Sequence, residues 1–254
     1  MKPPGSKQAE LQFELVVPAF NEAASLPALV ERTDRAACEA GLVHGQVRLV
    51  VVDNGSDDDT QATLAQLERG PHRSLLRCLH VPVNQGYGHG LWAGLSTSRA
   101  PFVGWTHADE QCDPADAFLA LARVQAADGR ALIKGRRRGR AIKDVLFSRT
   151  FETCAHLSLN LGLDEVNAQP KVMPRSLLSQ FTHPPKDFAF DLYALYQARK
   201  SGYVVDSIDV TMQPRAHGAS RWAVGVVKRS GTILRMLGHM AELQRREGRL
   251  RRAR

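Results

Sequence analysis

Residues 105–114 read WTHADEQCDP and directly follow a short apolar run that is typical of a buried strand. Pro114, with Asp113 as its N-cap, predicts the start of an amphipathic helix. Asp109 and Gln111 therefore lie in a tight loop at the carboxyl end of a strand, where open α/β sheets bind their ligands. A carboxylate and an amide oxygen in such a loop can both face one hard cation. The stretch predicts a divalent metal site that neutralises a diphosphate, although by itself it equally fits a polar turn with a good helix cap.

Strand-like and helix-like patterns alternate on both sides of this loop. Apolar runs predict strands at residues 11–17, 47–52, 75–81, 101–104, 131–134 and 203–210. Helical spacing and capping residues predict helices at residues 24–40, 60–69, 114–127, about 145–162 and 187–201, and one that follows the glycine-rich residues 84–90 and ends at 98. Strand–helix–strand units require right-handed crossovers and hence parallel strands. We therefore expect one α/β domain, a Rossmann-like three-layer sandwich with a mostly parallel central sheet.

The composition is that of an ordinary globular protein with a basic tail. The chain has 254 residues, of which 43% are hydrophobic and 24% charged, so it can bury a sizeable core. Residues 228–254 hold nine Lys or Arg and two Glu, which is +7 of the net charge of +8. This distribution argues against nucleic acid as a partner of the domain. Four widely spaced cysteines without a CxxC motif argue against a zinc site and favour a reducing cytoplasm.

Polar residues follow three of the predicted strands, at residues 18–22, at Asp53 and in the 105–114 loop. A carboxylate that ends the second strand can accept hydrogen bonds from a ribose or a base. The glycines of residues 84–90 leave room for the backbone to approach a ligand. Neither GxGxxG after the first strand nor GxxxxGK[ST] is present, which argues against a Rossmann dehydrogenase and a P-loop NTPase. A nucleotide held by carboxylates and a metal suits a nucleotide-sugar. His80 has no metal-ligand spacing and is interpreted as a surface or packing residue.

Six short motifs occur in order between residues 11 and about 221. They are VPAFNE at 17–22, VVDNGSDDDT at 51–60, NQGYG at 84–88, HADEQ at 107–111, KGRR at 134–137 and RAHGASR at 215–221. Each motif is weak alone, but their order and spacing together are specific. On these motifs the chain resembles family-2 glycosyltransferases of the GT-A fold, and it is similar to the dolichyl-phosphate and polyprenyl-phosphate sugar synthases.

The resemblance implies an inverting transfer of a sugar from a nucleotide-diphosphate sugar to a lipid-linked polyprenyl phosphate by a GT-A catalytic domain at residues 11–221. It implies nucleoside contacts from Pro18, Phe20, Glu22 and Asp53, and a diphosphate lined by Ala108 and Asp109. Mg²⁺ or Mn²⁺ would be held by Asp109 and Gln111. Phosphate groups would meet Arg137, Lys186, Arg215 and Arg221. The acceptor phosphate would meet a basic loop at residues 136–143 that includes Arg137 and Arg140, and Ser148 and Arg149 would also contact it. The alternative interpretation of this loop is a run of solvated charges without a ligand. Residues 167–171 are expected to form a polar turn near the sugar.

Three residues depart from the family pattern. His107 stands where the family often has the first Asp of a DxD motif, and neutral imidazole suits Mn²⁺ better than Mg²⁺. Either Asp109 and Gln111 hold the metal with phosphates and water, which we favour, or His107 is also a ligand and biases the site toward Mn²⁺. Glu110 replaces a common Gly, so the loop is expected to be stiffer. Arg221 replaces a usual Lys and changes a point charge into a fork.

The expected mechanism depends mainly on charge and positioning. A metal and Arg side chains offset the charge of the leaving nucleoside diphosphate. An acceptor phosphate is already anionic near neutral pH and needs no strong base. Asp109, Arg137 and Asp187 are the expected catalytic residues. A hydroxyl acceptor on a polysaccharide or small molecule would need a carboxylate base, for which Asp187 and Asp191 are candidates. Asp187 fits better as a helix cap, and Asp191 is alternatively an inward structural partner. A third possibility is a non-catalytic relative that binds nucleotide-sugars.

The two ends of the chain carry separate expectations. Residues 1–10 are expected to be a disordered lead-in. Apolar residues recur every three or four positions after Val224, so residues 222–254 predict an amphipathic helix with a basic end. Such a helix suits an anionic membrane surface, at roughly 1 kcal/mol per basic residue, or packs on its own domain. With no signal peptide and no long apolar segment, we expect a protein of cell-envelope glycan biosynthesis at the cytoplasmic face of the membrane. It would contact the membrane itself or a membrane protein. A homo-oligomer is compatible with the sequence, and the sequence does not specify the sugar or the base of the donor.

Overall fold

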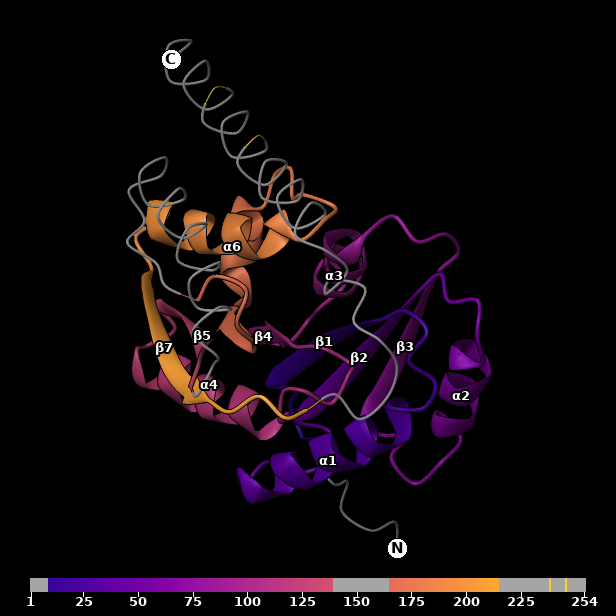
Figure 1. Ribbon diagram of the computed structural model, residues 1–254. Helices are drawn as coiled ribbons and strands as arrows, with labels where there is room; N and C mark the ends of the chain where they lie inside the picture. Colours follow the sequence, from indigo (N-terminus) through magenta and orange to yellow (C-terminus); the bar gives the residue numbers. More distant parts are fainter. Residues whose placement is uncertain (1–8, 139–164, 215–237, 239–244, 246–254) are drawn as a thin grey trace, which may run out of the picture.

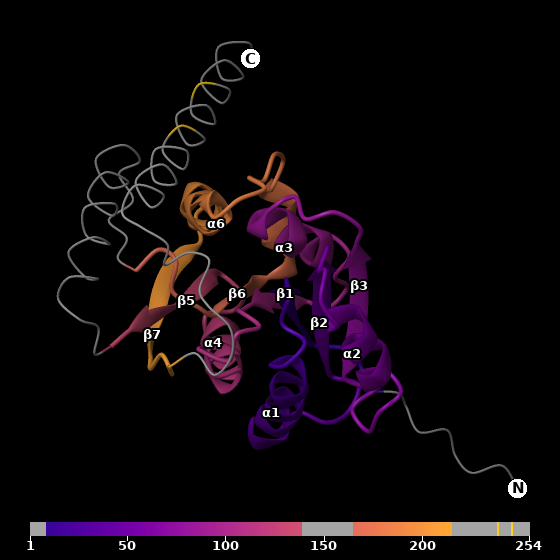
Figure 2. The same ribbon diagram turned by 45° about the vertical axis from the view of Figure 1, so that its right-hand side comes forward.

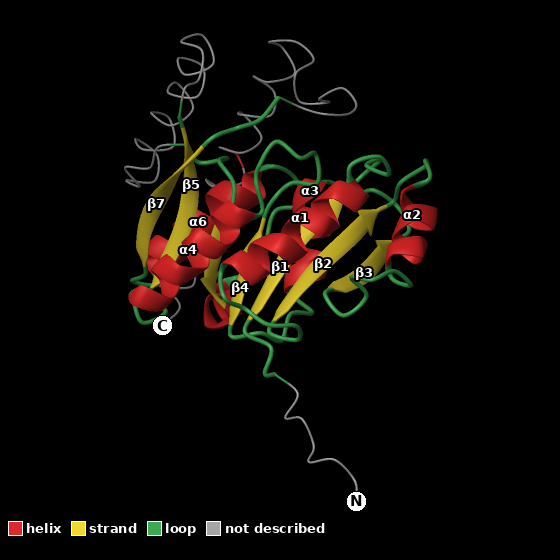
Figure 3. Ribbon diagram, turned by 90° about the horizontal axis from the view of Figure 1, so that it is seen from below, coloured by secondary structure: helices red, strands yellow, loops and turns green. Residues whose placement is uncertain are grey.

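A computed structural model of the chain describes residues 9–138 and 165–214, together with residues 238 and 245. Its centre is a seven-stranded sheet of order β3-β2-β1-β4-β6-β5-β7, in which only β6 runs antiparallel to its neighbours. Figure 3 shows this sheet with β3 at one edge and β7 at the other. The strands are β1 Phe13–Ala19, β2 Val47–Asn54, β3 Leu76–Val81, β4 Phe102–Trp105, β5 Ala131–Arg137, β6 Lys171–Pro174 and β7 Val204–Val210.

Helices cover both faces of the sheet (Figures 1 and 2). On one face α3 and α6 pack, and on the other α1 and α4, with α2 beside α1. The helices are α1 Leu26–Glu39, α2 Thr60–Leu67, α3 Tyr87–Leu95, α4 Ala115–Ala126 and α6 Ala189–Lys200, and a 3-10 helix spans Arg175–Gln180. No helix within these ranges is both long and apolar enough to cross a bilayer. The expected three-layer α/β architecture is confirmed.

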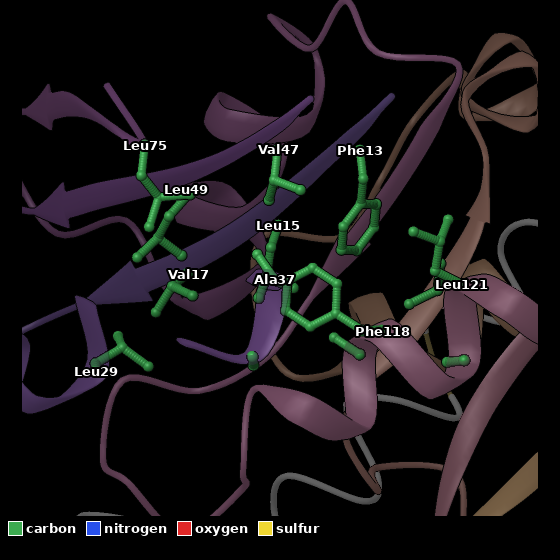
Figure 4. Packing of buried hydrophobic residues seen from close by; sticks show 14 of the residues in the cluster. Phe13, Leu15, Val17, Leu29, Ala37, Val47, Leu49, Leu75, Phe118 and Leu121 are labelled. Carbon is green, nitrogen blue, oxygen red and sulfur yellow. The ribbon is translucent and has the colours of Figure 1, made fainter. Parts of the chain in front are cut away.

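Two hydrophobic clusters form because strand side chains alternate between the faces. In β1, Phe13, Leu15 and Val17 belong to the cluster under α1 and α4, whereas Val16 belongs to the cluster under α3 and α6. Figure 4 shows the first of these clusters, in which the ring of Phe13 meets that of Phe118 edge-on, with 5.7 Å between centroids. Burial on both faces explains why the strands are continuous apolar runs in the sequence.

All the strands and helices predicted within the described residues are present, with ends shifted by a few residues. Helix α4 begins at Ala115, one residue later than predicted, and the Asp113 carboxylate caps it by accepting the Ala115 N–H at 2.9 Å. The predicted helix at 145–162 and nearly all of the predicted tail helix at 222–254 lie outside the described residues, as do residues 1–8 of the lead-in.

Strand β6 was not predicted. Residues 167–171 were expected to form a polar turn, but Lys171 is fully buried and is the first residue of an antiparallel strand between β4 and β5. A lysine in a short polar segment resembles a surface turn in the sequence. Only its partner on another element, described below, makes its burial possible.

The glycines of residues 84–90 allow close packing within the protein, and the expectation that they also let the backbone approach a ligand stays a prediction. A Cβ at Gly88 would lie 2.2 Å from the carbonyl oxygen of Pro185 and 2.7 Å from that of Asp187. A Cβ at Gly90 would lie 3.0 Å from the side chain of Asn54. Gly88 therefore lets α3 lie directly against the segment that leads into α6, and Gly90 lets it lie against the end of β2. The close approach joins two sides of the site described next.

We expect Gly88→Ala to destabilise the fold by about 2 kcal/mol. Alanine favours a helix by about 1 kcal/mol over glycine, but overpacking against rigid backbone costs more. Urea unfolding measures the difference. The control is Gly202→Ala, where φ is +80° but the added Cβ has nothing within 4 Å, so only backbone strain of about 1 kcal/mol is expected. Equal losses for the two variants would contradict the packing argument.

Candidate active site

The carboxyl ends of β1, β2 and β4 bring the predicted site residues together. Strand register places Ala19 opposite Asp53, and Val16 opposite Trp105. The Thr106 N–H donates to the carbonyl oxygen of Val16 at 3.2 Å, which holds the start of the loop at residues 106–114 beside β1. We call this loop the metal loop, after the site that the sequence predicts there. Its position at the end of a central parallel strand is where the sequence placed it.

Asp53 is fixed by two partners at the end of β2. Its side chain is buried, with Oδ1 accepting the Ser56 N–H at 3.0 Å and Oδ2 lying 2.8 Å from Nδ1 of His80. His80 lies on β3, directly opposite Asp53 in the register. The sequence offered no signal for this pair, because His80 has no motif and the register follows from β2–β3 pairing. The contact orients a carboxylate that the family resemblance assigns to the nucleoside.

The loop after β1 is tied to the loop after β2 through Asn21. Its φ is +59°, and its N–H donates to Oγ of Ser56 at 3.0 Å. Its side-chain oxygen accepts the Asp57 N–H at 3.0 Å, and its amide donates to the Asp57 carboxylate. The Glu22 N–H donates to Oγ1 of Thr60 at 3.0 Å. Hydrogen bonds therefore join the two loops that follow β1 and β2. The predicted nucleoside residues lie at the ends of these strands or in the first loop: Pro18, Phe20, Glu22 and Asp53.

The metal loop offers oxygen atoms but no preformed cage. Oδ1 of Asp109 accepts the Gln111 N–H at 3.3 Å, and the Gln111 amide donates to the carbonyl oxygen of Gln213 at 3.3 Å. Glu110 has φ +58°, the region that glycine favours, and its Oε1 is buried with no hydrogen-bond partner among the described residues. No group of three or more His, Cys, Asp or Glu in the described ranges is arranged to hold a metal. An unsatisfied carboxylate oxygen beside Asp109 fits a cation whose other ligands come from phosphates and water.

His107 lies within this loop in a setting that favours the neutral ring. Burial lowers its pKa, and the charges of Lys171 and Arg137 act in the same direction, while Asp109 and Asp191 oppose them. Its ring meets Tyr87 edge-on, with 5.7 Å between centroids. A neutral imidazole keeps a lone pair for a metal, so both expected roles of His107 stay compatible with the site.

A buried ion pair lies beneath the metal loop. Lys171 Nζ lies 3.0 Å from Oδ1 of Asp191, and both side chains are buried. The same carboxylate accepts hydrogen bonds from the Trp105 ring N–H at 2.9 Å and from the Gln169 amide at 3.2 Å. Burial lowers the pKa of Lys171, and the charge of Asp191 opposes that shift. Asp191 is thus the inward structural partner that the sequence offered as the alternative to a catalytic base.

The other candidate base, Asp187, caps α6. Its Oδ1 accepts the Ala189 N–H at 2.9 Å, as the capping interpretation expected. Next to it, Lys186 Nζ donates to the side-chain oxygen of Gln85 at 2.8 Å, which places the lysine beside the loop before α3. Phe188 stacks on Tyr87 with 4.9 Å between centroids. The segment before α6 therefore closes one side of the site.

The basic residues at the end of β5 separate into two sets. Arg136 and Arg138 both pair with Asp209 on β7, at 2.7 and 2.8 Å. Arg137 instead forms an ion pair with Glu165. The remaining predicted phosphate and acceptor residues, Arg140, Ser148, Arg149, Arg215 and Arg221, lie outside the described residues. Sequence reasoning missed Glu165, because nothing marks one acid in a polar segment as the partner of an arginine 28 positions earlier.

The glycosyl transferase family 2 model matches residues 14–205, and the chain belongs to this family. Its architecture defines it as a glycosyltransferase with a GT-A fold. It is 29% identical over 241 residues to dodecaprenyl-phosphate galacturonate synthase of Rhizobium johnstonii, covering 91% of this chain and 67% of that protein. It is 27% identical over 248 residues to polyprenol monophosphomannose synthase of Mycolicibacterium smegmatis, covering 92% of this chain and 89% of that protein.

Among solved structures, the chain is similar to glucosyl-3-phosphoglycerate synthase from Mycobacterium tuberculosis. The complex of that enzyme with Mn²⁺, uridine diphosphate and glucosyl-3-phosphoglycerate aligns with a TM-score of 0.66 at 20% identity, covering 90% of this chain and 77% of that one. This similarity confirms the expected GT-A fold, and the expectation of a family-2 glycosyltransferase is confirmed by the family model.

We expect Asp191→Asn to lower the free energy of unfolding by about 3 kcal/mol, because it leaves the buried Lys171 ammonium without its counter-charge. Chemical denaturation measures the loss. Asp187→Asn is the matched control: asparagine caps helices as well as aspartate does, so its effect should stay below about 0.5 kcal/mol. An Asp191→Asn protein with native stability and no transferase activity would instead indicate a catalytic base.

We expect Asn21→Ala to cost about 2 kcal/mol of stability and to weaken nucleotide-sugar binding about tenfold. Alanine disfavours positive φ by about 1–2 kcal/mol and removes the bonds to Asp57. Asn21→Gly loses the same side-chain bonds but tolerates the backbone, so it should fall between alanine and the native protein. Calorimetric titration with donor, alongside thermal unfolding, measures both effects. Equal effects of the two variants would show that backbone conformation is not the cause.

Proposed function

We propose that this glycosyltransferase moves a sugar from a nucleotide-diphosphate sugar to a polyprenyl phosphate, with inversion at the anomeric carbon. The observation that carries the choice of acceptor is the state of the two candidate bases. Asp191 is buried against Lys171, Trp105 and Gln169, and Asp187 caps α6. A hydroxyl acceptor would need one of them to take a proton, whereas an anionic phosphate does not. The two polyprenyl-phosphate synthases among the relatives support the same choice.

In the proposed reaction, the residues of this chain bind and orient two phosphorylated molecules. Asp53 and the loop around Asn21 hold the nucleoside, and the metal loop receives the diphosphate. An acceptor phosphate oxygen forms a bond to the anomeric carbon as the bond to the leaving diphosphate oxygen breaks, and that oxygen keeps the electron pair. Attack opposite the leaving group inverts the configuration. Arg137 offsets negative charge beside the reacting centre, which lowers the barrier by electrostatics and positioning.

Mg²⁺ or Mn²⁺ would be held by Asp109 and Gln111, with His107 as a further ligand for Mn²⁺. The bound ion supplies charge neutralisation for the diphosphate. The unsatisfied oxygen of Glu110 and the oxygen-rich loop support this assignment. The solved complexes of glucosyl-3-phosphoglycerate synthase with Mn²⁺ and with Mg²⁺ support a divalent ion in this fold.

The acceptor chemistry also suggests where the protein works. A polyprenyl phosphate resides in a membrane, so we infer action at the cytoplasmic face, with the basic residues after 228 attracted to anionic lipid or to a membrane protein. Sedimentation with vesicles of anionic and neutral lipid, at low and high salt, compares these modes of attachment.

The test combines sugar transfer with donor binding. Native protein, a panel of nucleotide-sugars, a polyprenyl phosphate and Mg²⁺ or Mn²⁺ should yield a lipid-linked sugar. Donor at 100 times its Kd should stabilise the fold by about 2.7 kcal/mol. Asp109→Asn should abolish the metal-dependent part of that stabilisation and reduce transfer about 100-fold or more. Asp209→Asn, at an exposed ion pair of β7, is the matched control and should change neither.

Three results would contradict the proposal. Transfer to a hydroxyl acceptor without lipid phosphate would favour a polysaccharide or small-molecule glycosyltransferase. Donor binding that is insensitive to EDTA, with no transfer or hydrolysis, would favour a nucleotide-sugar-binding protein without catalysis. Full activity of Asp109→Asn would remove the metal loop from the mechanism.

A further inference from the structure

Arg137 ends β5 on the side of the fold that carries the metal loop. It lies opposite Val210 of β7 in the register, and three residues beyond Val210 the Gln213 N–H donates to the carbonyl oxygen of Gln111 in the metal loop at 2.9 Å. The Arg137 side chain is 18% exposed, so its charge acts in a largely desolvated setting. Arg137 therefore lies near the metal loop.

Strand alternation separates Arg137 from its two neighbours. Successive side chains of a strand point to opposite faces, so Arg136 and Arg138 share one face and Arg137 has the other. The first two pair with Asp209, which is 47% exposed. Of the three consecutive arginines, Arg137 alone combines burial with a position beside the metal loop.

Glu165 contacts Arg137 at one edge of the guanidinium. The carboxylate oxygen Oε2 accepts from Nε, and the Glu165 side chain is only 14% exposed. Within the described residues, Nη1 and Nη2 of Arg137 have no hydrogen-bond partner. Guanidinium is planar and rigid, so a carboxylate held on Nε sets the direction of the opposite edge. That edge carries parallel N–H groups that match two oxygens of a phosphate.

Glu165 is itself held by the structure beneath the site. The Ala168 N–H donates to the Glu165 carbonyl oxygen at 3.0 Å, and Lys171 Nζ donates to the Ala168 carbonyl oxygen at 2.9 Å. The Gly135 N–H donates to the carbonyl oxygen of Pro170 at 2.8 Å, which joins the same turn to β5. The turn is therefore connected both to the strand that carries Arg137 and, through Lys171, to the buried pair with Asp191.

We propose that Glu165 is a positioning residue that aims the Arg137 guanidinium, so that its Nη edge receives the phosphate group of the acceptor. The inference rests on the proposed function for the identity of that phosphate. It goes further because it assigns a role to Glu165 and predicts whether removal of this carboxylate weakens or tightens phosphate binding. A carboxylate that merely competed with phosphate for Arg137 would weaken phosphate binding, and its removal would tighten it. A carboxylate that positions the fork strengthens binding, and its removal weakens it.

The test uses the full chain with geranyl phosphate as a soluble acceptor and with inorganic phosphate as a binding probe. Glu165→Ala should raise the KM for geranyl phosphate and the Kd for inorganic phosphate about tenfold, because removing a partner that orients a binding group typically costs 10–100-fold. The Kd of the nucleotide-sugar should change less than about twofold. Glu165→Gln, which keeps the shape but loses the charge, should give a smaller effect of the same sign.

A double-mutant cycle separates positioning from general damage. In an Arg137→Ala background, Glu165→Ala should cause no further loss, because its effect passes through Arg137. Asp209→Asn, which removes the partner of the neighbouring arginines, should leave all constants unchanged. If Glu165→Ala unfolds the protein, Glu165→Gln in the same cycle decides the question.

The outcomes also separate this inference from the proposed function. Phosphate binding that is tighter or unchanged in both Glu165 variants, or a loss that persists without Arg137, overturns the inference. If native protein transfers no sugar to geranyl phosphate, the proposed function fails. An Arg137-dependent weakening of inorganic phosphate binding by Glu165→Ala would then still support the positioning role.

Discussion

The rest of the site depends on the ion pair between Lys171 and Asp191. Its two residues lie on β6 and α6, and Trp105 at the end of β4 donates to the same carboxylate. The pair therefore joins the strand that leads into the metal loop to an inserted strand and to a helix. An unpaired charge at that depth costs several kcal/mol, whereas a pair with additional hydrogen bonds is tolerated. The arrangement strongly disfavours any packing in which β6 or α6 shifts.

This pair also explains why polar groups gather around it. Gln169 donates both to Asp191 and to the hydroxyl of Tyr87, and the Tyr87 ring contacts His107 and Phe188. The contacts lead without interruption from the buried charge to the metal loop and to the segment before α6. A glycosyltransferase must hold a diphosphate and an acceptor in one geometry, and rigid support beneath the binding loops serves that need.

Charged side chains in the site have fixed partners. Arg137 pairs with Glu165 and Lys171 with Asp191, and the Asp53 carboxylate lies within hydrogen-bond distance of the His80 ring. Each pair keeps one member in a defined direction without a bound substrate. The protein side chains then need little reorganisation when a polyanionic substrate binds, which is the general advantage of a preorganised electrostatic site.

The sequence by itself determined the α/β architecture, the family and most of the strand ends that form the candidate site. Apolar runs and caps carry that information locally, as the Asp113 and Asp187 caps illustrate. It did not determine strand β6, the packing role of Gly88, or the partners His80 and Glu165. Those features depend on which residue lies opposite which after folding, and neither strand register nor a contact between distant segments is written in any local pattern. The tertiary structure alone decided that Asp191 pairs with a buried lysine.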